Sequence, residues 1–195
     1  YVFRFDGLRW AQEQRLFASD QAWYDEFGKA VSVNGNAIVV GASMDDCVGG
    51  NSDCGAAYVF RFNGSRWLEE RKLTGPDTTT DDRFGSSVAV SGDALVVAAP
   101  RGDCAGPYLG CGAAFIFRYI GTSWVYEQKL TASDSETGDG FGSSVAIAEN
   151  LAVVGAIGVD CATPYSYCGA AYVFRFDGVN WAEQQKLITP DEAVW

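Results

Sequence analysis

The sequence repeats itself at a fixed spacing of 57 residues, and this spacing constrains the fold more than any other feature. Its most recognisable text is DEFGKAVSVNGNAIVVGAS from Asp25, DRFGSSVAVSGDALVVAAP from Asp82 and DGFGSSVAIAENLAVVGAI from Asp139. No insertion or deletion breaks the register between copies. A period of this length is typical of a solenoid, a propeller or an array of similar units.

Each repeat contains four segments that we expect to be β-strands. In the middle copy they are residues 84–90, 94–100, 112–119 and 123–130, rich in valine, alanine and aromatic residues and bounded by turn formers. Four antiparallel strands per unit, repeated, are typical of a β-propeller blade. We therefore predict an all-β chain of about three and a half blades, either a partial propeller or one that assembles; a β-solenoid, which usually has shorter coils, is the alternative.

The register divides the chain into a partial repeat and three full ones. Residues 1–24 hold the outer strands of a blade, and repeats 1, 2 and 3 are residues 25–81, 82–138 and 139–195. An open blade exposes apolar surface and a strand edge. We therefore expect the chain to be part of a longer repeat protein, or to associate head to tail into a ring or a filament.

The Phe-Gly pair of each repeat is expected to open its first strand. The phenylalanine would pack between neighbouring units, and the glycine would allow close backbone approach or an unusual φ. One tryptophan column is interpreted as core, and one arginine column is expected to pair with acidic neighbours. These columns are Trp10, Trp67, Trp124 and Trp181, and Arg4, Arg61, Arg118 and Arg175.

The motif FGSSVAVSGDALVVAAP…CGAAFIF resembles the FG-GAP repeat, the blade unit of integrin α-subunit propellers. The GAP element reads GAS at 41–43, AAP at 98–100 and GAI at 155–157. The resemblance covers three full repeats and part of a fourth. It implies an extracellular β-propeller that binds partners.

Integrin-type repeats often carry a D-x-D-x-D-G-x-x-D calcium loop between the first two strands, and this chain departs from that pattern. The corresponding segments, residues 33–37, 91–94 and 148–151, are tight turns that cannot supply six or more oxygen ligands. We therefore expect no cofactor at these positions.

A carboxylate pair precedes each Phe-Gly and offers a weaker calcium hypothesis. Asp77 with Asp82, and Asp134 with Asp139, could each share one cation. The alternative is structural, because an aspartate before a turn bonds its own backbone.

Six cysteines form three Cys-x6-Cys pairs between the second and third strands of each repeat. Repeat symmetry favours one disulfide per loop, and the spacing is unusual for zinc in a chain without histidine. Disulfides indicate an oxidising compartment, so we expect the protein to be secreted, on the cell surface or in a periplasm. The predicted pairs are Cys47–Cys54, Cys104–Cys111 and Cys161–Cys168. Asn63, in Asn-Gly-Ser, is a glycosylation acceptor in a eukaryotic source.

Charge and composition exclude several classes of function. The net charge of −11 argues against nucleic acid, and no apolar run is long enough to span a bilayer. The absence of histidine removes the commonest general base, and the carboxylate pairs recur in every repeat, whereas a catalytic pair is a singular site. We therefore expect no enzyme.

Aromatic residues in the connectors are the candidate ligand-binding positions, because turns do not need them. Exposed aromatic side chains beside polar groups suit sugar or protein contacts, and packing against the next loop is the alternative. The candidates are Trp23, Tyr24, Tyr108, Tyr165 and Tyr167.

These observations favour a non-catalytic extracellular module for adhesion or scaffolding. Its partners would be a protein or glycan ligand and further copies of the repeat, including a homo-oligomer. Two alternatives stay open: a subunit of a self-assembling structural polymer or filament, and a lectin-like propeller that binds sugars.

Overall fold

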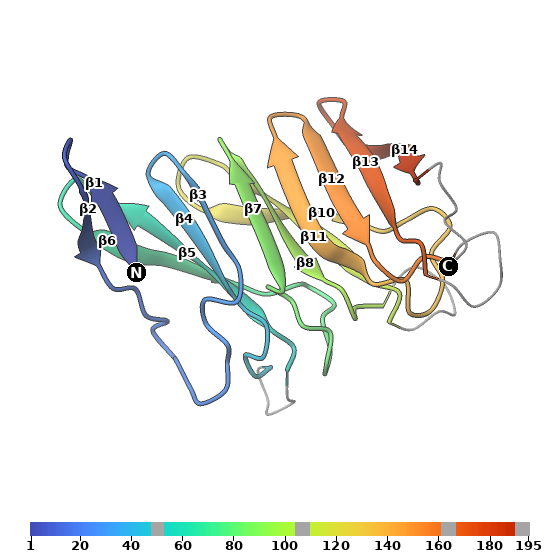
Figure 1. The fold of residues 1–195 in the computed structure, drawn as a ribbon, viewed down its shortest axis with the longest axis horizontal. Coiled ribbons are helices and arrows are strands. Elements are labelled where there is room, and N and C mark those ends of the chain that lie inside the picture. Colours follow the sequence, from blue (N-terminus) through green and yellow to red (C-terminus); the bar gives the residue numbers. More distant parts are fainter. Residues whose placement is uncertain (48–52, 104–109, 161–166, 190–195) are drawn as a thin grey trace.

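The computed structural model describes residues 1–47, 53–103, 110–160 and 167–189. Within these residues every element is a β-strand, and the strands form one two-stranded and three four-stranded antiparallel sheets (Figure 1). The prediction of blades with four antiparallel strands is confirmed. The described residues contain no helix long and apolar enough to cross a membrane.

The sheets follow one another along the chain, and each is built in sequence order. The half blade consists of β1 (Val2–Phe5) and β2 (Trp10–Gln14). Blade 1 consists of β3 (Val31–Asn34), β4 (Ala37–Ala42), β5 (Ala56–Phe62) and β6 (Trp67–Leu73). Blade 2 consists of β7 (Ser87–Ser91), β8 (Ala94–Ala99), β9 (Ala113–Tyr119) and β10 (Trp124–Leu130). Blade 3 consists of β11 (Phe141–Ala148), β12 (Leu151–Ala156), β13 (Ala170–Phe176) and β14 (Trp181–Leu187).

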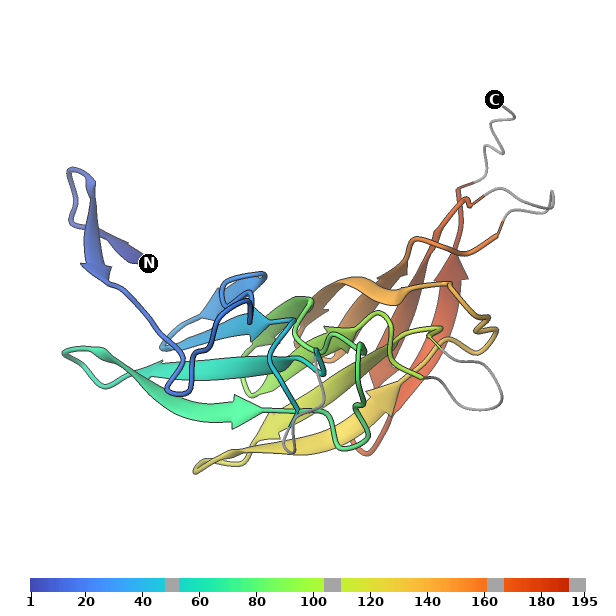
Figure 2. The ribbon, with the colours of Figure 1, turned by 90° about the horizontal axis from the view of Figure 1, so that it is seen from below.

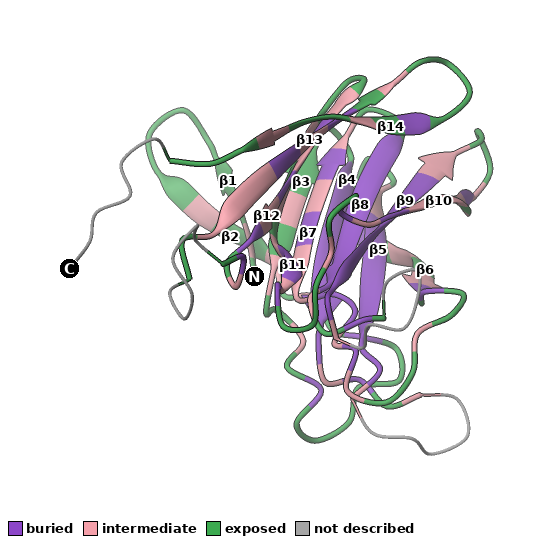
Figure 3. Ribbon diagram, turned by 90° about the vertical axis from the view of Figure 1, so that its right-hand side faces the viewer, coloured by how far each residue is buried: buried purple, intermediate pink, exposed green. Residues whose placement is uncertain are grey.

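The blades stand side by side along the long axis of the molecule, with the half blade at one end and blade 3 at the other (Figure 1). Figure 2 shows the same row from below, with β1 and β2 set off from blade 1. The apolar core lies between the blades. Val39, Val59 and Leu73 of blade 1 pack in one buried cluster with Phe84 and Val88 of blade 2. Buried residues concentrate in the central strands, and β1 and β2 are mostly exposed (Figure 3).

The Phe-Gly pair joins neighbouring blades. We predicted that it opens the first strand of its repeat, but in repeat 2 it lies before that strand. Strand β7 begins at Ser87, whereas Phe84 forms an isolated parallel bridge with Gly55. The Phe84 N–H donates to the carbonyl of Cys54 across 2.8 Å. The expectation is also wrong in repeat 1, where β3 begins at Val31, after Phe27, and it held in repeat 3, where β11 begins at Phe141. Phe141 forms the same kind of bridge, with Gly112, but it also pairs with Ala156 of β12, whereas the pairing of β7 with β8 begins at Ser87.

The glycine of the Phe-Gly pair allows two backbone segments to approach closely, as we expected from its lack of a side chain. Gly85 has a φ of +91°, and a Cβ there would lie 2.2 Å from the carbonyl oxygen of Ala56. Facing it, a Cβ on Gly55 would lie 2.0 Å from the carbonyl oxygen of Phe84. Two backbones thus meet where any larger residue would push the blades apart.

The disulfide prediction is confirmed for the one pair whose two cysteines are both described. Cys47 and Cys54 form a disulfide, and Cys111 and Cys168 are also disulfide-bonded. Cys104 and Cys161 lie outside the described residues, so their pairing stays a prediction.

Three arginines of the column pair with a glutamate on the adjacent strand: Arg4 with Glu13, Arg61 with Glu70 and Arg118 with Glu127. Arg175 has no ion pair among the described residues, and this part of the prediction is wrong. The reason is that Gln184 replaces the glutamate in that repeat.

Candidate functional site

The half blade docks on blade 1 through the contacts that complete blades use. The Gln14 side chain donates to the Trp67 carbonyl and accepts from the Trp67 N–H, both across 2.8 Å. Gln128 and Trp181 repeat this pair of bonds between blades 2 and 3. Strands β1 and β2 therefore dock as the two outer strands of a blade do.

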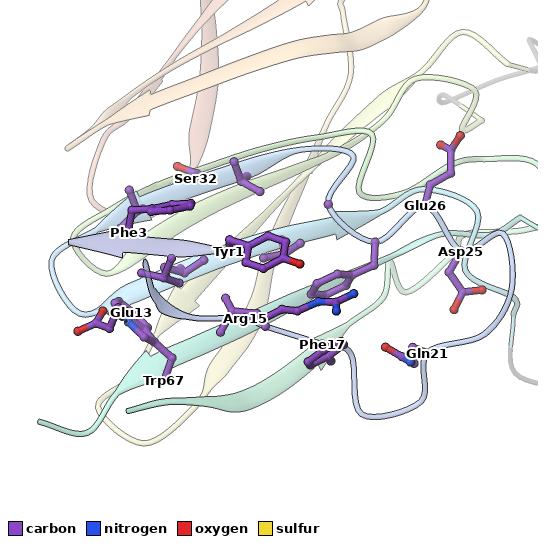
Figure 4. A pocket seen from close by; sticks show the side chains of 18 of the residues that line it. Tyr1, Phe3, Glu13, Arg15, Phe17, Gln21, Asp25, Glu26, Ser32 and Trp67 are labelled. Carbon is purple, nitrogen blue, oxygen red and sulfur yellow. Dashed lines mark hydrogen bonds between the residues drawn. The ribbon is translucent and has the colours of Figure 1, made fainter. Parts of the chain in front are cut away.

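An open cleft lies beside the half blade, where the inner strands of such a blade would be. Its volume is about 1210 Å³, and its walls come from β1, β2, the connector to blade 1, and β3 and β4. Figure 4 shows Tyr1 and Phe3 of the half blade and Trp67 of blade 1 around it. The lining is mainly aromatic and aliphatic, with a few charged groups such as Glu13 and Arg15.

The tryptophan column is buried in complete blades, but Trp10 is not. Trp124 is 1% exposed and Trp10 is 69% exposed. The core interpretation is therefore wrong for Trp10 in this structure, because no described residue covers its indole as blade 1 covers that of Trp124.

Trp23 and Tyr24 stand at the cleft on the connector that leads to Phe27. Their side chains are 91% and 86% exposed. The turn beneath them is fixed by Asp25, whose carboxylate accepts the Ala22 N–H across 2.6 Å. The structure thus holds two large aromatic side chains in solvent on an ordered turn.

The same turn recurs in the other repeats with different side chains. Asp82 accepts the Thr79 N–H and Asp139 accepts the Glu136 N–H, each across 2.7 Å. The positions of Trp23 and Tyr24 are occupied by Thr80 and Asp81 in repeat 2, and by Thr137 and Gly138 in repeat 3. A constant backbone with variable side chains is typical of a binding loop on a rigid scaffold.

Tyr24 adopts a backbone conformation that favours glycine. Its φ is +74°, and the matching positions, Asp81 and Gly138, have φ values of +70° and +90°. A non-glycine residue in this region costs about 1–3 kcal/mol, and such residues cluster at functional sites. Repeat 3 avoids this cost with glycine, whereas repeat 1 keeps a tyrosine.

The predicted carboxylate pairs have separate partners. Asp77 pairs with Lys129 and Asp134 pairs with Lys186, each across 2.7 Å, whereas Asp82 and Asp139 hold the turns. Burial raises the pKa of the Asp82 carboxyl. The residues that the structure describes contain no group of three or more potential metal ligands of the His, Cys, Asp or Glu type.

One polar cluster escaped the sequence analysis. The Tyr58 hydroxyl lies 2.7 Å from a carboxylate oxygen of Asp20 and 2.5 Å from one of Asp45, so its single proton is available to either, and the Lys72 ammonium donates to both carboxylates. Burial and the two carboxylates raise the pKa of Tyr58 well above its usual value. The sequence signal that could have revealed this cluster is Asp45, because the matching positions in the other repeats are Gly102 and Val159.

The other predicted aromatic positions do not join this site. Tyr167 is 78% exposed and forms a bridge with Asp160, and it does not line the cleft. Tyr108 and Tyr165 lie outside the described residues. Of the predicted aromatic residues that the structure describes, only Trp23 and Tyr24 therefore lie together at the cleft.

The repeat itself identifies the family. The model of the FG-GAP repeat family matches residues 10–60, 67–117 and 124–174. This chain belongs to the FG-GAP repeat family. No curated protein sequence matches it.

Among solved structures, this FG-GAP chain resembles Saccharomyces cerevisiae Sqt1, with a TM-score of 0.51 and 12% identity over 86% of the chain and 37% of Sqt1. It thus spans just over a third of that protein. It also resembles the tricorn protease, with a TM-score of 0.43 and 12% identity over 76% of this chain and 17% of that one. At such identities the likeness to Sqt1 shows the fold alone.

Proposed function

We propose that this FG-GAP chain is a non-catalytic extracellular module for adhesion or scaffolding, and that it contacts a protein or glycan through connector residues. The observation that carries the proposal is the pair Trp23 and Tyr24, held in solvent by the Asp25 turn. Aromatic side chains give large contact areas at low entropic cost, and tryptophan and tyrosine are enriched among residues that dominate binding energies.

The chemistry of the described connectors supports a binding role over a catalytic one. Their carboxylates accept backbone N–H groups or pair with lysines, so each already serves the fold. The disulfide between Cys47 and Cys54 supports an oxidising, extracellular setting.

Exchange of the connector residues tests this proposal. In the variant W23T/Y24G, repeat 1 takes the Thr-Gly pair of repeat 3, which suits the positive φ at position 24. We expect unchanged folding and a loss of binding of about tenfold or more on a glycan array or a panel of extracellular proteins.

The matched control is the conservative variant W23F/Y24F, which keeps both rings and should retain most of the binding. Binding that is equal for W23T/Y24G and the unmodified chain would contradict the proposal. Signal confined to the glycan array would favour the lectin-like alternative.

A second candidate function, a subunit of a structural polymer, is favoured by the open face of blade 3. On this face two valines, Val153 and Val173, are only partly buried and Leu187 is exposed. The residues that match the two valines in blade 1, Val39 and Val59, are fully buried under blade 2. A heterologous contact on such a face can generate a ring or a filament. Electron microscopy and sedimentation of the purified chain test this alternative, and a monomer at high concentration would contradict it.

A further inference from the structure

The exposure of the pair Trp23 and Tyr24 belongs to its place in the repeat and does not depend on the cleft. The residues that match Trp23 are Thr80, in the connector between blades 1 and 2, and Thr137, in the connector between blades 2 and 3, and both are exposed. A partner of the aromatic pair therefore approaches an edge that every repeat presents.

The connectors that form this edge are strongly acidic. Because neighbouring strands run antiparallel, the connectors after the second and the fourth strand leave each blade on one edge, opposite the tight turns of the inner hairpins (Figure 1). They contain fourteen acidic and four basic residues, whereas the rest of residues 1–189 contains nine acidic and ten basic ones. The connectors are residues 15–30, 43–55, 74–86, 100–112, 131–140 and 157–169. The negative charge of the chain is thus concentrated on the edge that carries the aromatic pair.

Around the aromatic pair, the positive charges of the connectors are already engaged, whereas one carboxylate is available. Lys29 pairs with Glu26 across 3.1 Å, and the Arg15 guanidinium lies over the ring of Phe17 at 4.4 Å. Asp46 is exposed and forms no ion pair with the residues that the structure describes. The local charge therefore favours a cationic partner over an anionic one.

Asp46 lies on the connector that contacts the aromatic turn. The Met44 N–H donates to the Asp25 carbonyl across 3.2 Å and joins the two connectors. Trp23 and Tyr24 directly precede Asp25, and Asp46 follows Met44 by two positions. Two exposed aromatic rings and an exposed carboxylate thus lie on adjoining segments of the edge.

The fold itself shows which group an aromatic ring and a carboxylate bind together. The Lys186 ammonium lies over the ring of Tyr172 at 5.5 Å and pairs with Asp134 across 2.7 Å. Lys129 is held in the same way in blade 2. A ring face attracts a cation through its quadrupole, and the carboxylate adds a charge-assisted hydrogen bond.

From these contacts we propose that the partner of Trp23 and Tyr24 is a protein segment with exposed lysine or arginine side chains. One of these cations packs on the aromatic pair and pairs with Asp46, and the acidic connectors attract the others. This assignment rests on the proposed function, because it names the partner of the same aromatic pair. A neutral sugar would not use the charge of Asp46, and an acidic sugar would be repelled by it.

Titration of the chain of residues 1–195 with a basic peptide tests this proposal. The probe is a short peptide in which lysine and arginine alternate with serine, and its counterpart carries glutamate at the basic positions. We expect a saturable shift of the Trp23 indole N–H signal with the basic peptide and no shift with the glutamate peptide. Raising the salt concentration from about 50 to about 500 mM should weaken binding by about fivefold or more, because exposed charges are screened.

Asp103 provides the matched control for Asp46. It occupies the same position in repeat 2 and is also exposed, but Thr80 and Asp81 replace the aromatic pair there. D46N and D103N change the net charge equally, and the asparagine of D103N can still accept the Gly110 N–H. D46N should weaken binding of the basic peptide by about threefold or more, whereas D103N should leave it within about twofold.

The variant W23T/Y24G should weaken binding of the basic peptide by about tenfold or more, because it removes both rings. The amides of β8 and β9 report whether each variant is folded.

The proposal is overturned if D46N and D103N weaken binding equally, since net charge alone would then explain it, or if the glutamate peptide binds as well as the basic one. It is also overturned, while the proposed function stands, if an oligosaccharide shifts the Trp23 indole signal and the basic peptide does not. If W23T/Y24G binds every probe as the unmodified chain does, the proposed function fails and this assignment fails with it.

Discussion

The half blade and blade 2 carry the same residue types at matching positions and bury them very differently. Phe3 and Phe117 occupy one column, yet the first is half exposed and the second is buried between strands and blades. Both belong to antiparallel pairs whose turn is closed by the same backbone bond, from the Asp6 N–H to the Arg9 carbonyl and from the Ile120 N–H to the Ser123 carbonyl, each across 3.0 Å. Local pairing therefore forms the hairpin, whereas burial depends on the neighbouring repeat, as expected when stability is a sum over adjacent units.

The two regions are alike in the contacts of their outer strands. Arg4 lies over the ring of Phe62 at 5.1 Å, as Arg118 of blade 2 lies over Phe176 at 4.7 Å. The difference in the burial of Phe3 and Phe117 therefore does not come from this contact. This leaves the Phe-Gly segment and the first two strands of each blade as candidates for the source of that difference.

The largest expected effect comes from deleting the phenylalanine ring of the Phe-Gly pair. Phe84 is fully buried against blade 1 and its own blade, whereas Phe27 faces the cleft. Phe84→Ala should lower the free energy of unfolding by about 3–5 kcal/mol. Phe27→Ala should cost clearly less. Chemical denaturation of both variants checks this, and equal losses would break the comparison.

The adjacent glycine sharpens the same comparison with a smaller effect. At Gly85 an added Cβ meets the Ala56 carbonyl and a positive φ, so Gly85→Ala should cost about 2–4 kcal/mol. At Gly28 the φ is +100° but nothing lies within 4 Å, so Gly28→Ala should cost only about 1 kcal/mol. Thermal unfolding separates the two, and a larger loss for Gly28→Ala would contradict our interpretation of the cleft.

Lys72 ties the half-blade connector to blade 1, and Lys186 is its matched control. Lys72 pairs with Asp20 and with the buried Asp45, whereas Lys186 pairs with Asp134. Lys72→Met should cost about 1–3 kcal/mol, because it leaves Asp45 without its ammonium partner. Lys186→Met should cost about 0–1 kcal/mol. Urea denaturation at neutral pH measures both, and the reverse order would be inconsistent with this cluster.

The same cluster gives the sign of a pH effect. Burial alone would raise the pKa of Asp20, but Lys72 and the Tyr58 hydroxyl outweigh it and hold the pKa below its usual value. The ion pair is therefore fully present at neutral pH, and its contribution is lost as the pH falls through the folded-state pKa. The loss caused by Lys72→Met should shrink on acidification.

The smallest effect concerns the connector itself. Tyr24→Gly relieves the positive φ but gives the unfolded chain more freedom, so we expect a gain in stability of less than about 1 kcal/mol. The melting temperature should rise slightly or stay level. A marked drop would mean that the Tyr24 ring packs in solution and is not a free binding group.

The period and turn residues were enough to predict the strands and their order. The predicted segment 94–100 is β8 (Ala94–Ala99), and 123–130 is β10 (Trp124–Leu130). The early start predicted for β7 was wrong, because its pairing with β8 begins only at Ser87, whereas Phe141 in repeat 3 pairs with β12. Both repeats have the text Phe-Gly-Ser-Ser at this point, so the difference could not be predicted from the sequence.

The candidate site was predictable only in part. Trp23 and Tyr24 stood out because the repeats share a turn but differ in side chain. The cleft could not be inferred, since it depends on the docking of β1 and β2 through Gln14. Asp45 was recognisable only as a difference between copies, and its partners Tyr58 and Lys72 became clear in three dimensions.

The most direct test of the central claim, that burial in a blade depends on its neighbours, is to supply inner strands to the half blade. A copy of residues 25–57 fused directly before Tyr1 continues the 57-residue register and supplies an inner hairpin to the half blade. We predict that the amides of Val2–Phe5 then exchange as slowly as those of Ala56–Phe62, and that the exposed ring of Phe3 becomes buried. Fast exchange of β1 in a fusion whose other blades are folded would contradict the account.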